Sequence, residues 1–328
     1  MLSLHGPEGA VTPDPGGPIP GNAVWLDLKD PSSEEAAAVE AATGLRVPSR
    51  AALSEVESSS RLRRVKGGLS LSTPMITFER SDSQLKPLGF LLSKDHLVTI
   101  RFHDLRAIDS SEKRIADGDG SVTPSEIFLV ILEELVDSLA DALEDMATEL
   151  DQLSTRIFDF DVRGANRRRL ESPPPRRRDL ALRRILRGIS NRGKVLGKIR
   201  ASLLGLERIV PFVSAACDGL GLPEDGRFET IRRDIDSLDE FETRLAENVQ
   251  FLLDATLGLI NIEQNNVFRV LTVVSVVGVP PTLIASMYGM NFKHMPELDW
   301  AYGYPYALGL ILFSALAPIV YFRIRGWF

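Results

Sequence analysis

The sequence predicts an α/β domain followed by a long helix and two C-terminal helices that cross a membrane. Residues 67–78 and 87–102 are rich in apolar and β-branched residues, a pattern typical of strands. Between Phe228 and Val279 there is no proline, and apolar residues recur mostly at three- and four-residue steps, which indicates one continuous helix. No charged residue occurs between Val270 and Phe292 or between Ala301 and Phe322, and each run is long enough to cross a bilayer as a helix.

The α/β domain is expected to cover residues 22–122. Asn22–Leu28 is predicted to be its first strand, and Ser32 is expected to cap the following helix, because Glu34 and Glu35 occupy the first turn after it. Residues 1–21 are rich in glycine and proline and lack a basic, apolar signal segment, so a short disordered leader is predicted there.

Residues 123–226 are predicted to be helical and carry strongly segregated charge. Glu126–Asp151 holds nine carboxylates and no lysine or arginine, whereas Arg163–Arg200 is basic and contains three consecutive prolines. Such blocks either pair with each other and face the solvent, or the basic block binds anionic lipid or nucleic acid. The basic block has no interleaved aromatic residues, so no nucleic-acid partner is expected.

The long helix is expected to cover residues 227–288, beginning in water and continuing into the first membrane span. It would be roughly 80 Å long at about 1.5 Å per residue. Every hydroxyl residue of the span lies on one stripe with three- and four-residue steps, formed by Asn265, Phe268, Thr272, Ser275, Val279, Thr282 and Ser286. This stripe could face a water-filled lumen, or its hydroxyls could mediate helix contacts and bond to the preceding turn.

The two spans are predicted to form a hairpin, with a loop at 289–304 and the second span and tail at 305–328. Arg269, Arg323 and Arg325 flank the spans, so the positive-inside rule places both termini in the cytoplasm and the loop outside. A two-span hairpin encloses no pore alone, so conduction would need several chains around one axis. A single cysteine fits a reducing compartment, and the four histidines form no zinc-site pattern.

The loop carries the motifs that point to a family. Its residues read Tyr-Gly-Met-Asn at 288–291, Met-Pro-Glu-Leu at 295–298 and Tyr-Gly-Tyr-Pro at 302–305. These motifs, at the exit of one span and before a second, resemble the signature of the CorA magnesium and cobalt transporters. Asn261–Asn265, Val273–Val277 and the strand Ala23–Leu28 resemble the proteobacterial branch of that family.

The resemblance implies a homopentameric funnel in the cell inner membrane, with the first span lining the pore and the second packed outside it. It implies a selectivity filter formed by Gly289, Met290 and Asn291. It also implies that the pore is lined by Asn265, Phe268, Leu271, Thr272, Ser275, Val279 and Thr282. Phe268, Leu271 and Val279 would form apolar constrictions that could close by dewetting.

These residue types suit Mg²⁺, which holds its waters tightly and prefers oxygen ligands. A ring of Asn291 amide oxygens and Gly289 and Met290 carbonyls could accept hydrogen bonds from a hydrated ion. Gly289 would permit a close backbone approach or a positive φ at the helix end. Glu297 and Asp299 on the loop would concentrate cations outside the membrane.

The family also implies regulation by cytosolic Mg²⁺, with Co²⁺ and Ni²⁺ as further transported ions. The stalk aspartate that binds regulatory metal in relatives falls on Thr230 here, so Glu229, Asp234 and Asp236 are the candidates to replace it.

Three functions remain open at this level. The first is passive, potential-driven Mg²⁺ influx, and the second is zinc transport by the same architecture. The third is a membrane-anchored scaffold whose basic block binds anionic lipid or nucleic acid. An enzyme is not expected, because the sequence contains no metal-ligand cluster, nucleophile motif or phosphate-binding loop.

Overall fold

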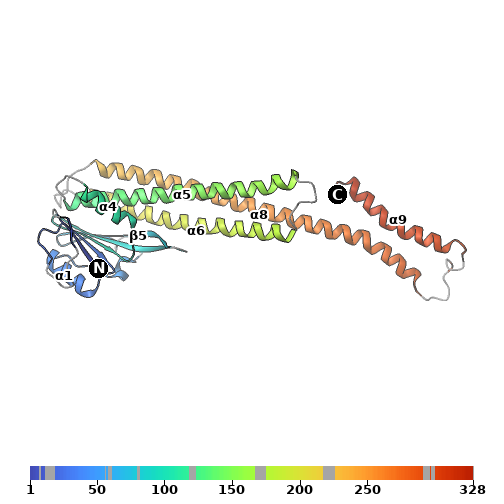
Figure 1. The fold of residues 1–328 in the computed structure, drawn as a ribbon, viewed down its shortest axis with the longest axis horizontal. Coiled ribbons are helices and arrows are strands. Elements are labelled where there is room, and N and C mark those ends of the chain that lie inside the picture. Colours follow the sequence, from blue (N-terminus) through green and yellow to red (C-terminus); the bar gives the residue numbers. More distant parts are fainter. Residues whose placement is uncertain are drawn as a thin grey trace. The chain divides into compact units, whose positions relative to one another are not determined.

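The computed structural model describes residues 1–6, 9–11, 19–55, 57, 61–79, 82–117, 123–166, 175–216, 226–290, 296 and 300–327. The chain forms two compact units, residues 1–162 with 187–253, and residues 163–186 with 254–328. The first unit contains an α/β domain, and the second contains two apolar helices (Figure 1). The predicted fold class is therefore confirmed at the level of the single chain.

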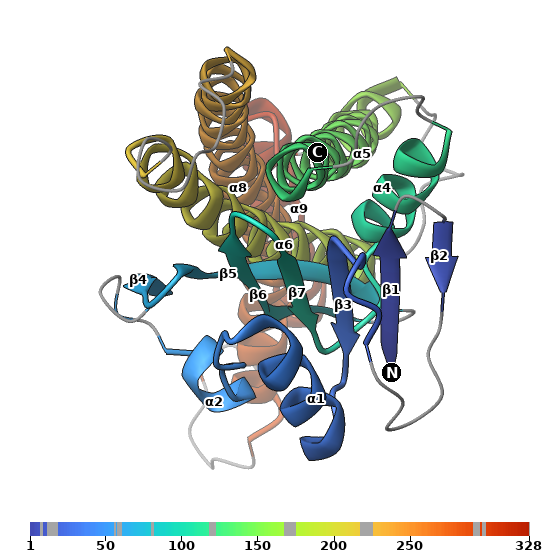
Figure 2. The same cartoon turned by 90° about the vertical axis from the view of Figure 1, so that its left-hand side faces the viewer.

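One seven-stranded sheet organises the α/β domain, with the strand order β2-β1-β3-β7-β6-β5-β4. β3 and β7 pair in parallel, with Trp25 opposite Leu97, and every other neighbouring pair is antiparallel. Figure 2 shows this sheet with α1 and α2 on one side and α6 on the other. The strands are β1 (Leu2–Gly6), β2 (Gly9–Val11), β3 (Trp25–Lys29), β4 (Leu62–Val65), β5 (Gly68–Glu79), β6 (Asp82–Ser93) and β7 (Leu97–Arg101).

The prediction of a disordered leader is wrong for the N-terminal strands. β1 pairs with β3 in antiparallel fashion, with Leu4 opposite Leu26, and the side chains of Leu2 and Leu4 are buried. The alternation of apolar residues at positions 2 and 4 is the strand pattern, but it is only one repeat long and the glycines and prolines that follow obscure it.

Seven helices are present among the described residues, and two of them, α2 and α4, were not expected from the sequence. Ser32 caps α1 as predicted, because its hydroxyl accepts a hydrogen bond from the Glu35 amide at 3.1 Å while the Glu35 carboxylate accepts one from the Ser32 amide. The helices are α1 (Ser33–Thr43), α2 (Arg50–Leu53), α4 (Arg106–Ala116), α5 (Pro124–Asn166), α6 (Pro175–Ser214), α8 (Arg227–Tyr288) and α9 (Gly303–Ile324).

In the first unit, the acidic helix α5 pairs with basic residues of neighbouring helices. The Arg192 side chain contacts Glu149 at 3.0 Å, and Arg227 contacts Glu133 at 2.8 Å. Arg192 belongs to the basic block and Arg227 does not, so the first of these pairs is a contact between the two charge blocks. Arg167–Arg169 lie outside the described residues.

A buried polar network crosses the centre of the sheet. Asp27 accepts hydrogen bonds from Arg101 Nε at 2.9 Å and from the Thr99 hydroxyl, and Thr99 accepts one from Trp25 Nε1 at 3.1 Å. Burial alone would lower the pKa of Arg101, but the charge and hydrogen bonds of Asp27 outweigh burial and raise the pKa. Asp27 and Arg101 therefore form a buried ion pair that joins the two parallel strands.

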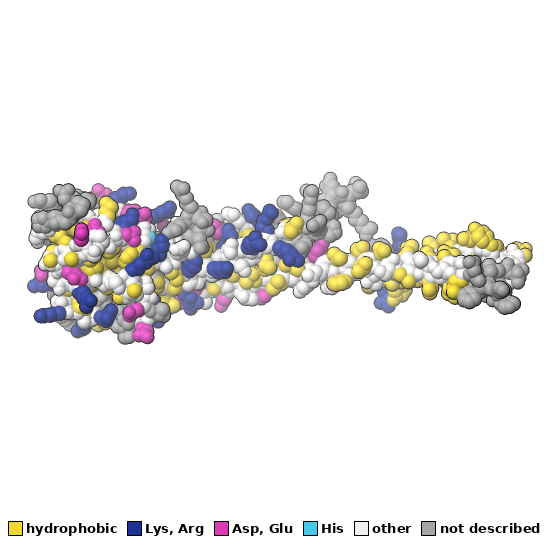
Figure 3. Space-filling model, turned by 90° about the horizontal axis from the view of Figure 1, so that it is seen from below, with side chains coloured by type: hydrophobic (Ala, Val, Ile, Leu, Met, Phe, Trp, Pro, Cys, Tyr) yellow, Lys and Arg dark blue, Asp and Glu magenta, His cyan; other side chains and the backbone are white. Residues whose placement is uncertain are grey.

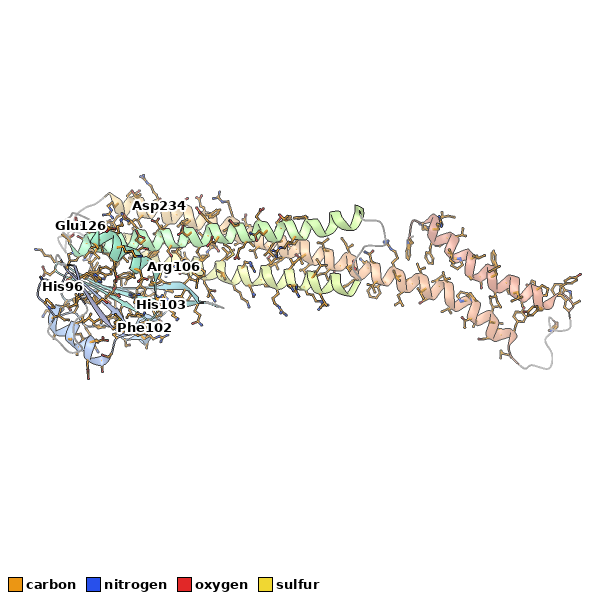
Figure 4. The ribbon with its side chains drawn as sticks, in the orientation of Figure 1. His96, Phe102, His103, Arg106, Glu126 and Asp234 are labelled. Carbon is orange, nitrogen blue, oxygen red and sulfur yellow. The ribbon has the colours of Figure 1, made fainter. Side chains whose placement is uncertain are left out.

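His103 lies just after β7 (Figure 4). Its protonation makes the stability of the folded protein depend on pH. Burial, followed by the positive charges of Lys86 and Arg101, lowers the pKa of His103 to about 4, and neither ring nitrogen has a hydrogen-bond partner among the described residues. The folded protein holds this histidine neutral, whereas the unfolded chain takes up a proton as the pH falls below about 6.5.

We therefore expect stability to fall as the pH drops from about 6.5 towards 4, by about 2 kcal/mol at pH 5 from this group alone. Urea unfolding at pH 7 and pH 5 would measure the loss, and His103→Gln should reduce it. An equal loss in the variant would contradict this account.

Candidate ion pathway

The second unit contains two helices that are long and apolar enough to cross a membrane. Their most apolar stretches lie within α8 and α9, and only 6% of each stretch is buried within the chain. Figure 3 shows hydrophobic side chains covering this part of the surface with few charged ones among them. Such a surface requires lipid or further copies of the chain to cover it.

α9 covers one side of α8. Val273 of α8 and Phe322 of α9 are buried, and Val277, Pro280, Pro281 and Ile284 are half-buried. The Arg269 guanidinium lies over the ring of Trp327, 5.6 Å from its centroid, and Trp327 stacks on Phe322. The three flanking arginines therefore lie at the same end of the hairpin. The contacts of Trp327 with Arg269 and Phe322 were not predicted from the sequence. The only signal for them is that Trp327 follows the flanking arginines.

The polar stripe lies on the other side of α8. At about 100° per residue, the stripe is about 150° around the helix from the side that α9 covers. Phe268 and Val279 are 65% and 62% exposed, and the other predicted pore residues are also exposed: Asn265, Leu271, Thr272, Ser275 and Thr282. One side of the helix is thus covered by α9, while the described residues of the chain leave the side with the hydroxyls exposed.

Two hydroxyls of the stripe bond to the preceding turn. Thr272 donates to the Phe268 carbonyl and Thr282 donates to the Gly278 carbonyl, both at 2.8 Å. A hydroxyl that donates in this way keeps its acceptor lone pairs. These bonds therefore leave both threonines able to accept hydrogen bonds from water or from a hydrated ion.

α8 ends just before the predicted filter. The Gly289 amide donates to the Ala285 carbonyl at 3.0 Å and the Met290 amide donates to the Met287 carbonyl at 3.3 Å. Gly289 does not have a positive φ, so of the two alternatives expected there only the close backbone approach remains. A Cβ added at Gly289 would lie 3.3 Å from the Ala285 carbonyl oxygen, which is consistent with a close backbone approach. Asn291, Glu297 and Asp299 lie outside the described residues.

The candidate regulatory acids are exposed near the start of α8, where Figure 4 labels Asp234. Glu229 contacts Arg233 at 3.4 Å, one turn further along the same helix. Among the described residues, no group of three potential ligands is close enough to hold a metal ion, so the structure does not bring Glu229, Asp234 and Asp236 together within one chain.

The comparisons with known proteins show the family of this chain. The profile of the family described as "CorA-like Mg2+ transporter protein" matches residues 21–324. The chain belongs to the CorA-like Mg²⁺ transporter family. As a CorA-type divalent-cation transporter, it is a membrane protein and not an enzyme.

The relatives match over nearly their full lengths. The magnesium transport protein CorA of Haemophilus influenzae is 31% identical over 311 residues, and that of Escherichia coli strain K12 is 32% identical over 315 residues. In each case the match covers 93% of this chain and 92% of the relative. The complete structure of the CorA magnesium transporter from Methanocaldococcus jannaschii superposes with a TM-score of 0.76 at 21% identity, covering 100% of this chain and 98% of that one.

Proposed function

We propose that five copies of this chain form a channel for passive Mg²⁺ influx, with the polar stripe of α8 lining the pore. The observation that carries the proposal is the position of the stripe in a CorA-family chain, on the side of α8 opposite to the contact with α9. An assembly around one axis places the stripe against water while α9 and the apolar sides meet lipid. In this arrangement the remaining acceptor lone pairs of the stripe hydroxyls meet water and not hydrocarbon.

The proposed filter is the ring of Gly289, Met290 and Asn291. Mg²⁺ loses its waters reluctantly, so a neutral ring of amide and carbonyl oxygens that accepts hydrogen bonds from the hydrated ion avoids the cost of dehydration. Carboxylates at Glu297 and Asp299 raise the local cation concentration at the entrance. The membrane potential drives entry with about 4.6 kcal/mol per 100 mV for a dication. Co²⁺ and Ni²⁺, of the same charge, are further candidate ions.

Gating is assigned to the apolar positions of the stripe and to the acids at the start of α8. Phe268, Leu271 and Val279 would form rings that close the pore by dewetting. Cytosolic Mg²⁺ bound by Glu229, Asp234 and Asp236 between neighbouring copies would favour the closed state. By the positive-inside rule, the arginines at one end of the hairpin, Arg269, Arg323 and Arg325, support cytoplasmic termini. The proposed location is the cell inner membrane.

The adjacent pair Asn265 and Asn266 provides a matched test of the pore-lining side. Both side chains are exposed, but only Asn265 lies on the stripe, and Asn266 is about 100° further around the helix. Asn265→Ala removes a polar group from the lumen, so we expect a several-fold change in Mg²⁺ uptake into proteoliposomes. Asn266→Ala should leave uptake unchanged, and equal effects of the two variants would contradict the assignment.

Competition experiments distinguish Mg²⁺ from zinc transport. Hexaamminecobalt(III) imitates a hydrated ion that cannot shed its ligands, so it should block Mg²⁺ uptake if the filter recognises the hydrated ion. Uptake of Zn²⁺ that exceeds uptake of Mg²⁺ and resists this complex would instead favour a zinc transporter.

A further inference from the structure

α9 ends in a turn that folds Trp327 back onto the helix. Gly326 has a φ of 71°, in the left-handed region that glycine adopts most readily. The Gly326 amide donates to the Arg323 carbonyl at 3.1 Å, and the Trp327 amide donates to the Phe322 carbonyl at 3.0 Å. These two bonds form a Schellman motif, in which the residue after the glycine often packs on the helix. Trp327 does so by stacking on Phe322, with ring centroids 5.0 Å apart, so the helix end fixes the position of its ring.

Arg269 of α8 lies between the polar stripe and the side that α9 covers. At about 100° per residue, it is about 40° around the helix from Asn265 of the stripe and about 40° from the buried Val273. The long, flexible side chain of an arginine can reach either side from such a position. In this chain the guanidinium lies over the ring of Trp327, 5.6 Å from its centroid, and is therefore directed towards α9. No ion pair joins Arg269 to a described carboxylate.

The direction of this guanidinium bears on the pore of the proposed channel, on which the inference rests. Five copies would carry five such charges at the proposed cytoplasmic end, each only four residues after Asn265. Rings of arginine or lysine line pores for anions, whereas acidic rings line pores for cations. Five guanidinium groups directed into the lumen would therefore oppose the passage of a dication.

We propose that Trp327 is a positioning residue for cation transport. Its ring keeps Arg269 on the side of α9 and so keeps a ring of positive charge out of the ion pathway. Tryptophan suits this task, because its ring attracts a cation more strongly than those of tyrosine or phenylalanine. The end of α9, which does not line the proposed pore, thereby controls the electrostatic potential in it.

Two substitutions at Trp327 separate the attraction of the ring for a cation from its packing on Phe322. Trp327→Leu keeps an apolar contact but has no aromatic face, whereas Trp327→Phe keeps a ring. In proteoliposomes with an inside-negative potential, we expect Mg²⁺ uptake per assembled oligomer to be several-fold slower in Trp327→Leu than in the wild type. Trp327→Phe should remain close to the wild-type rate. Equal rates in the two variants would overturn the proposal.

Removal of the Arg269 charge is the second test. Because Trp327 acts through that charge, Arg269→Gln and the double variant with Trp327→Leu should take up Mg²⁺ at the same rate. The slow uptake of Trp327→Leu should also recover when an impermeant chloride salt is raised from about 0.15 M to about 1 M, since the screening length falls from about 8 Å to about 3 Å. A defect caused by lost packing would respond to neither change.

Arg325→Gln is the matched control. It removes a positive charge at the same end of the hairpin, but Arg325 lies over the ring of Tyr321, 5.7 Å from its centroid. Added to Trp327→Leu, it should leave uptake slow. Rescue by Arg325→Gln as large as that by Arg269→Gln, or no rescue by either, would overturn the proposal.

The same measurements distinguish a failure of this inference from a failure of the proposed function. A wild-type protein that takes up Mg²⁺, beside a Trp327→Leu variant that does so equally fast, would overturn the inference alone. A wild-type protein that forms oligomers but takes up no Mg²⁺ would refute the proposed function and the inference with it.

Discussion

Replacement of Asn291 by alanine is expected to reduce potential-driven Mg²⁺ uptake at least about tenfold. The change removes the amide oxygen from every subunit of the proposed ring at once, so the hydrated ion loses a full set of hydrogen-bond acceptors that neighbouring residues do not replace. Mg²⁺ uptake into proteoliposomes with an imposed inside-negative potential measures the effect. Asn291 lies outside the described residues, so this prediction depends on the family motif.

Two further variants sharpen that result. Asn291→Gln keeps the amide but moves it by one methylene group, so an intermediate rate is expected. Asn261→Ala changes an asparagine about eight turns before the filter, at about 3.6 residues per turn, and should retain the filter's ion preference. Uptake by Asn291→Ala at the wild-type rate would refute the filter assignment while leaving the rest of the pathway open to test.

Replacement of Asp27 by alanine is expected to destabilise the α/β domain by about 3–5 kcal/mol, the usual cost of removing one partner of a buried ion pair. The Asp27 side chain is 1% exposed and that of Arg101 7%, with Arg101 Nη2 2.8 Å from Asp27 Oδ2. The variant leaves a buried guanidinium without its carboxylate between the two parallel strands. Urea unfolding of the detergent-solubilised protein, followed by tryptophan fluorescence, measures the loss, because Trp25 belongs to the same network.

The exposed pair of Lys29 and Asp104 is the matched control. Asp104 is 77% exposed, so Asp104→Ala should cost less than about 1 kcal/mol. Replacement of both Asp27 and Arg101 by apolar residues of similar size should recover much of the stability that Asp27→Ala loses. A cost for Asp27→Ala no larger than that for Asp104→Ala would contradict the role assigned to the buried pair.

The sequence predicts the long helices best, because their signal extends over many turns. α8 begins at Arg227 and ends at Tyr288, the range expected from the absence of proline before Val279 and from the apolar steps. α9 begins at Gly303, two residues before the expected second span. The N-cap at Ser32 can also be predicted from the sequence, because the capping box depends on residues that are close together in the chain.

Features that depend on contacts between distant residues could not be predicted in this way. β1 is five residues long and is recognised by its pairing with β2 and β3. The ion pair joins Asp27 and Arg101, which are 74 residues apart. The close packing of α6 on β5 depends on Gly205, where an added Cβ would lie 2.0 Å from Thr73 Oγ1. The contact between Arg269 and Trp327 likewise joins the start of one span to the end of the other.

In the candidate site, too, local patterns can be predicted from the sequence and contacts between distant residues cannot. The three- and four-residue steps identify the stripe on α8, and the structure adds which side of the helix α9 covers. The regulatory acids illustrate the opposite case, because Glu229, Asp234 and Asp236 are neighbours in sequence but face the solvent without forming a site within one chain.

The central claim is that this chain conducts Mg²⁺ passively under the membrane potential. The most direct measurement is Mg²⁺ entry into liposomes that contain the purified wild-type protein, with an inside-negative potential imposed in one sample and abolished in the other. The account predicts entry that rises with the imposed potential, is slower in the sample without a potential and needs no nucleotide. Absence of Mg²⁺ entry, with intact pentamers confirmed in the same liposomes, would contradict it.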